Sequence, residues 1–141
     1  MKKYEFTGKT KMHDDVVLHQ IRALVDIPDQ AVKAGDVGGW IEHEGNLSHT
    51  GSCWVGNNAR VLRDATVSLN SDVVSIDNVG SKNGTLTMYK TEDGVGVCRG
   101  CFAGTYDEFI DAVKETHGNN THARFYLAIA PLLKSKILEE I

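Results

Sequence analysis

The middle of this chain, from Val37 to Gly80, reads VGGWIEHEGNLSHTGSCWVGNNARVLRDATVSLNSDVVSIDNVG. One position in every six is a valine, apart from two histidines, and the series runs Val37, His43, His49, Val55, Val61, Val67, Val73, Val79. A second series lies four residues after each of the first six positions, and its side chains become smaller along the chain. Its members are Ile41, Leu47, Cys53, Ala59, Ala65 and Ser71. Turn-forming pairs such as Gly45-Asn46 lie between the two series. This repeat predicts short parallel strands wound into a triangular solenoid.

The expected fold class is therefore mainly β, with a short parallel β-helix of hexapeptide repeats over residues 37–80. Three hexads make one coil, so residues about eighteen positions apart should stack. Val37, Val55 and Val73 would then share one column, and on the outer surface Glu42 would lie over Arg60.

The segments on either side of the repeat should cap the solenoid, because its open ends would otherwise expose apolar surface. In residues 1–36, two apolar stretches separated by polar residues predict N-terminal strands. In residues 81–141, Thr85 to Lys90 and Val95 to Cys98 predict a β-hairpin.

Two helices are expected after this hairpin. Thr105 followed by Glu108 is a capping box at the start of the first helix. The second is expected from Thr121 to the C-terminus, and Pro131 in its middle should kink or split it.

Composition narrows the functional classes. The chain has 141 residues, with 15 basic and 19 acidic side chains and a net charge of -4, which argues against general nucleic-acid binding. No apolar run approaches the length needed to span a bilayer, and three cysteines without a secretory signal are typical of a reducing compartment. We expect a soluble cytoplasmic protein that interacts neither with membranes nor, in general, with nucleic acid, and we expect no cofactor.

Several stretches of the repeat resemble left-handed β-helix proteins of bacteria and their phages; they are Ala34 to Glu42, Asn46 to His49, Cys53 to Val55 and Asn58 to Val61. The tail segments Gly100 to Thr105 and Glu115 to Asn120 resemble the ends of short phage and prophage proteins. The resemblance implies a left-handed coil. It also implies association about a threefold axis, as a trimer or a multiple of it, with ligand sites in the clefts between subunits.

The candidate ligand-binding residues combine cations, a donor-rich loop and one aromatic ring: Trp54, Arg60, Arg63, Ser81, Lys82, Asn83 and Arg99. Arginine suits phosphate because its planar fork can donate two parallel hydrogen bonds. Tryptophan can stack on a base. The alternative is that the cations are merely solvated and that Trp40 and Trp54 pack at an interface between subunits.

A zinc site is an alternative hypothesis. Cys98, Cys101, His117 and His122 have a spacing that formally matches a zinc pattern. However, Gly118 breaks the chain between the two histidines, whereas a zinc finger carries both on one helix. Packed cysteines and surface histidines are the alternative, and we expect no metal. His43 and His49 could be ligands or proton carriers, but no third ligand has an evident spacing.

These observations favour a binding protein over an enzyme. We expect a non-catalytic, phage-encoded homo-oligomer that sequesters a small anionic, nucleotide-type ligand or a host protein, as in counter-defence in the host cytoplasm. A hexapeptide-type acyltransferase and a structural assembly module are the two alternatives.

Overall fold

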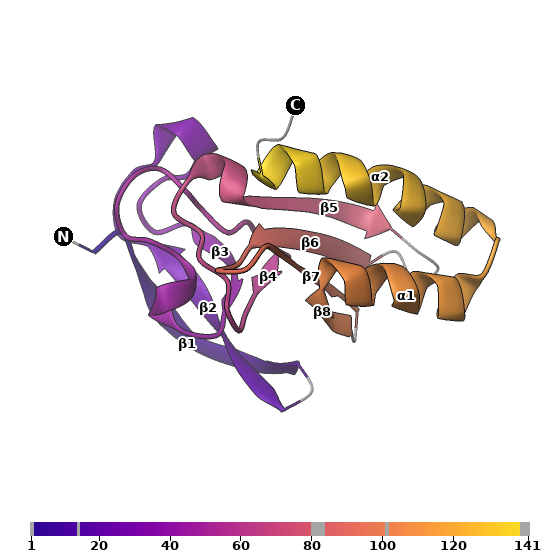
Figure 1. Cartoon of the computed structure of the whole chain (residues 1–141). Helices are drawn as coiled ribbons and strands as arrows, with labels where there is room; N and C mark the ends of the chain where they lie inside the picture. The colour runs from indigo at the N-terminus through magenta and orange to yellow at the C-terminus, as the bar shows by residue number, and fades with distance from the viewer. Residues whose placement is uncertain (1, 14, 80–83, 101, 139–141) are drawn as a thin grey trace.

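The computed structural model describes residues 2–13, 15–79, 84–100 and 102–138 (Figure 1). The first sheet contains, in spatial order, β1 (Tyr4–His13), β2 (Val16–Ala23), β3 (Val37–Ile41) and β4 (Arg60–Val61). The second contains β5 (Val73–Val79), β6 (Gly84–Lys90), β7 (Val95–Arg99) and β8 (Phe102–Thr105). All neighbouring strands are antiparallel except β3 and β4.

Helical elements complete the fold. Three short 3₁₀ turns lie in the first two thirds of the chain: η1 (Pro28–Gln30), η2 (Glu44–Asn46) and η3 (Asn70–Asp72). Two α-helices follow the second sheet, α1 (Tyr106–His117) and α2 (Thr121–Leu138), and both pack on one of its faces (Figure 1). No helix in the described ranges is both long and apolar enough to cross a membrane.

The predicted β-helix is wrong. The described residues form two mostly antiparallel sheets and two helices, and they contain no three-walled coil. The parallel contacts that do occur join Trp40 to Arg60, Ile41 to Val61 and Leu47 to Val67. Each pair is twenty positions apart in sequence rather than eighteen, so the proposed columns do not exist.

Side-chain size explains why the stacking register differs from the hexad register. Ile41 and Leu47 lie in one layer, and they stack on Val61 and Val67 in the next. All four side chains are buried in one core. An eighteen-residue register would instead have buried Val37 and His43. Both side chains are exposed here, and the exposed fraction of Val37 is 43%. A shift of two positions thus fills the core with the larger aliphatic groups.

The contact expected between Glu42 and Arg60 is also absent. With the register shifted, Glu42 Oε1 accepts a hydrogen bond from the backbone N–H of Arg63 at 2.6 Å. Arg60 is the direct neighbour of Trp40 across the β3–β4 pair.

The second half of the chain agrees with the local sequence signals. β6 and β7 form the predicted hairpin. The Thr105 capping box is confirmed, since Glu108 N donates to Thr105 Oγ1 at 3.1 Å and Thr105 N donates to Glu108 Oε1 at 2.9 Å. Pro131 does not split α2, which continues through it. The proline lies on the exposed side of the helix.

The second sheet separates two hydrophobic cores. Alternate residues of a strand point to opposite faces. On β6, Leu86 and Met88 pack against the helices, while Tyr89 packs in the core shared with the first sheet. This alternation decides which candidate residues can meet, because it assigns every side chain of β6 and β7 to one of the two faces.

Candidate functional site

Arg60 lies where the two sheets meet. It belongs to β4, the edge strand of the first sheet, and its backbone N–H donates to Thr87 Oγ1 of β6 at 3.1 Å. Its guanidinium group reaches β1, where Nη1 is 3.1 Å from His13 Nδ1. Arginine can only donate, so Nδ1 of His13 is the acceptor in this contact.

Buried beneath Arg60 is a thiol. Cys98 Sγ lies 3.9 Å from His13 Nδ1, and both side chains are buried. Cys98 is on the face of β7 that points to the first sheet, opposite Thr87 of β6. Burial raises the pKa of Cys98 to about 11, although the positive charges of Arg60, Lys11 and Arg63 act to lower it. The three cations are therefore all within electrostatic range of this sulfur.

Lys11 also lies near Arg60, and it is on the same strand, β1, as His13. Its Nζ lies 4.3 Å from the centroid of the Trp40 ring, a cation–π contact. Partial burial and then the charge of Arg60 lower the pKa of Lys11. Burial is the larger of the two causes, and the effect of Arg60 places its positive charge near Lys11.

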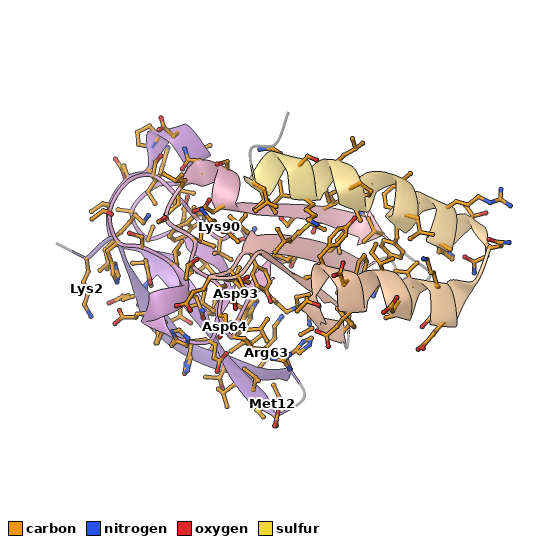
Figure 2. All side chains as sticks on the ribbon, viewed as in Figure 1. Lys2, Met12, Arg63, Asp64, Lys90 and Asp93 are labelled. Atoms are coloured by element: carbon orange, nitrogen blue, oxygen red, sulfur yellow. The ribbon has the colours of Figure 1, made fainter. Side chains whose placement is uncertain are left out.

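Arg63 is more exposed and borders acidic groups. Its Nη1 donates to Ala103 O of β8 at 3.2 Å. In Figure 2, Arg63 lies between Asp64 and the tip of the β1–β2 hairpin, which Met12 marks. A cavity of about 210 Å³ is lined by Arg63 together with Asp64, Asp93 and Glu108. Arg63 thus stands between an acidic cavity and the Lys11–Arg60 pair.

We call Lys11, Arg60 and Arg63 the cationic cluster. Ion pairs in the described part of the chain join Lys2 to Glu44 and Arg22 to Glu5, and His49 Nε2 lies 3.3 Å from Glu44 Oε1. None of them involves the cationic cluster. Arg63 is bordered by Glu42, Asp64 and Glu108, whereas Lys11 and Arg60 are in no ion pair among the described residues. The positive surface that an anion can neutralise is therefore centred on Lys11 and Arg60.

Arg99 does not join this cluster. It lies on β7 next to Cys98 in sequence, so it points to the helix side of the second sheet. There its Nε donates to Tyr126 Oη of α2 at 2.7 Å. The second sheet therefore separates Arg99 from Arg60, and the predicted grouping of these arginines is only partly realised.

Trp54 lies elsewhere, with its ring packed against the backbone of Gly38. It lines the open cavity of about 710 Å³ between η1, residues 54–59 and the start of β5. Among the described residues, no lysine or arginine lines this cavity, and Asp36 does, so the lining does not favour an anion. Trp40, and not Trp54, is the tryptophan beside the cations.

The remaining candidates add no second site. Ser81, Lys82, Asn83 and Cys101 lie outside the described residues. Of the other proposed zinc ligands, Cys98 is buried beside His13. The described residues contain no group of three or more side chains arranged to hold a metal.

His43 and His49 have different surroundings. His43 is exposed. His49 stacks on the Tyr4 ring at 4.1 Å, and its Nδ1 accepts from the backbone N–H of Lys3 at 3.1 Å. These contacts indicate a packing role for His49.

Sequence reasoning missed Lys11, His13 and the part played by Trp40. The signal was present, since Lys11 and His13 alternate with Met12 and therefore share one face of a strand. What could not be foreseen was that this face would meet β4, because the contact joins residues forty-seven positions apart.

Because of Cys98, the free energy of unfolding should fall as the pH rises above about 9. Its pKa rises from an ordinary value near 9 to about 11 on folding, so the folded state retains a proton that the unfolded state loses between these pH values. The stability due to the neutral thiol is complete below about pH 9 and falls as pH rises toward 11. We expect wild type to lose about 2 kcal/mol more than Cys98→Ala across this window. Urea unfolding at a series of pH values measures the difference, and parallel pH profiles for the two proteins would contradict the assignment.

No protein-family model matches this chain, and comparisons with curated proteins and with solved structures find no match either. The fold and the site define the class: an α+β protein of two four-stranded sheets, with Lys11, Arg60 and Arg63, none of them in an ion pair among the described residues, near the place where the sheets meet.

Proposed function

We propose that this chain is a non-catalytic binding protein that holds a small phosphate-bearing ligand at the cationic cluster. The observation that carries the proposal is that Lys11 and Arg60 both lie beside Trp40 and that no ion pair among the described residues includes either of them. Hydrogen bonds from arginine to phosphate are charge-assisted and therefore stronger than neutral ones.

A nucleotide suits this surface better than phosphate alone. The Trp40 ring is in contact with Lys11 and is the neighbour of Arg60 across the strand pair. An aromatic group beside two cations can take a base while the cations take the phosphate.

A binding role agrees with the state of the thiol at this site. Catalytic cysteines have lowered pKa values and are partly exposed, because the thiolate is the nucleophile. Cys98 is buried, and its pKa is raised. The acyltransferase alternative drew on the hexapeptide coil, and that coil is absent from the described residues.

The biological setting of the proposal rests on sequence resemblance. Sequestration of a nucleotide signal by a phage-encoded protein in the host cytoplasm remains our hypothesis. A host protein as the sequestered partner, and a purely structural assembly role, are the outcomes to consider if small anions do not bind.

Calorimetric titration with adenosine monophosphate, and separately with inorganic phosphate, tests the site. We expect Arg60→Gln and Lys11→Gln each to weaken binding of the nucleotide about tenfold, the effect of losing one charge-assisted hydrogen bond. Trp40→Ala should weaken binding of adenosine monophosphate but leave phosphate unchanged. Binding should also weaken as salt concentration rises.

Arg22→Gln is the matched control. Arg22 lies on the same sheet but is paired with Glu5, its Nη2 2.5 Å from the carboxylate. Its replacement should leave the affinity unchanged. If wild type binds neither probe, the proposal fails; if binding survives Arg60→Gln and Lys11→Gln, the ligand site lies elsewhere.

A further inference from the structure

The four edge strands of the two sheets differ in how they are protected against pairing with another chain. An unprotected edge is a template for a further strand, and lysines, bulges or short length normally block it. β1 carries Lys9 and Lys11 and a register break between Phe6 and Thr10. β4 has two residues and β8 has four, and Arg63 already donates to a β8 carbonyl.

β5 lacks these protections over its first half. Residues Val73 to Ile76 pair regularly with β6, and they include no lysine, arginine or proline. The register breaks only between Ile76 and Val79. The outer side of this strand is the most open edge in the described part of the fold.

The flank of α2 above this edge is apolar and exposed. α2 packs over β5 and β6, whereas α1 packs over β7 and β8 (Figure 1). Lys134 of α2 lies 4.6 Å from the ring of Tyr106, so the side of α2 that carries Lys134 faces α1. On the opposite flank lie Phe125, 42% exposed, and Leu132, 71% exposed, with Ile129 between them.

The pattern of charge favours a second copy of this chain as the partner. A twofold axis places each group close to the same group of the other copy, so any charge near the axis is repelled. The helix segment from Phe125 to Leu133 and the strand segment from Val73 to Ile76 contain no charged residue. This is unusual in a chain with 24% charged residues and a net charge of -4.

We propose that the protein forms a twofold dimer through β5 and the outer flank of α2. The two β5 strands pair antiparallel and join the second sheets into one, and the Phe125, Ile129 and Leu132 stripes of the two helices pack together. The arrangement replaces the threefold association, which depended on a coil that the fold lacks. The partner's β5 would also border the cavity that contains Trp54, since Val73 and Ser75 line its side.

Sedimentation equilibrium tests the dimer directly. We expect a mass twice the chain mass of 15.4 kDa. Leu132→Glu puts a charge next to the axis, and Ser75→Lys puts a lysine on the strand edge. Each should raise the dissociation constant at least about tenfold, as for other central interface residues. Both positions are exposed, so a thermal melt should show that both variants fold.

Met12→Glu is the control, since Met12 is 60% exposed but lies on β1. It should leave the mass unchanged. A monomeric or trimeric wild type overturns the proposal, and so does a dimer that Met12→Glu dissociates while Leu132→Glu does not. The titration with adenosine monophosphate does not test the dimer, because the cationic cluster lies between β1 and β4, whereas the proposed dimer interface is on β5 and α2.

Discussion

Replacing Asn46 with leucine is expected to lower the free energy of unfolding by about 3 kcal/mol. Asn46 is completely buried in η2, and its side chain joins two layers of the chain. Its Oδ1 accepts from the backbone N–H groups of Glu42 and His43, each at 3.0 Å. Its Nδ2 donates to the carbonyls of Arg63 at 3.1 Å and Ala65 at 3.2 Å.

Leucine has a similar volume but can make none of these four hydrogen bonds. Buried backbone groups that lose a partner each cost about 1 to 3 kcal/mol. Glu42 N–H keeps a second acceptor, Val61 O at 3.2 Å, so its loss is partial. Against a total stability of about 5 to 15 kcal/mol, the change is severe.

Urea denaturation measures the effect, and Asn58→Leu is the matched control. Asn58 lies one layer further along the same stretch of chain but is exposed. Its substitution should change stability by about 0.5 kcal/mol at most. Asn46→Asp should destabilise the protein at least as much as Asn46→Leu, because it buries a carboxylate oxygen against the carbonyls of Arg63 and Ala65. Equal effects at Asn46 and Asn58 would show that the network does not hold the layers together.

Gly39→Ala is expected to destabilise the protein by about 3 kcal/mol. A Cβ atom on Gly39 would lie 2.5 Å from Ala59 O and would also overlap Gly56 O. These backbone atoms cannot move freely, because Ala59 O accepts from Trp40 N at 3.0 Å and thereby holds β3 against the next layer. The layers would have to separate to admit a single methyl group.

Gly56→Ala gives the opposite sign and serves as its control. Apart from its two chain neighbours, no described residue has an atom within 4 Å of the position that a Cβ would take on Gly56, and its φ is not positive. Alanine there reduces the freedom of the unfolded chain and should stabilise the protein by about 0.4 to 1 kcal/mol. Thermal melts of the two variants should therefore move in opposite directions from wild type. A shift in the same direction would mean that close packing at Gly39 is not what limits substitution.

Local signals predicted the β6–β7 hairpin and the start of α1, but neither the place of β5 in the second sheet nor β8. The capping box at Thr105 and the strands of the β6–β7 hairpin depend on residues within a few positions of one another. The first half depended on a register between distant layers, and there the prediction of a solenoid was wrong. The candidate site depends on the same distinction, because Lys11 and His13 contact Trp40 and Arg60 across the fold and no local pattern indicated these contacts.

The sequence by itself determined which residues would be apolar, where turns and helix ends fall, and that Val55, Val61 and Val67 would be buried. Only the tertiary structure decided that Ile41 stacks on Val61, and that Arg99 and Arg60 lie on opposite sides of a sheet. A shift of two positions leaves the alternation of every strand intact, so local pattern cannot distinguish the two registers. The volume of the side chains that meet across the layers distinguishes the two registers. Close packing favours the register that buries Ile41 and Leu47 over the one that would bury Val37 and His43.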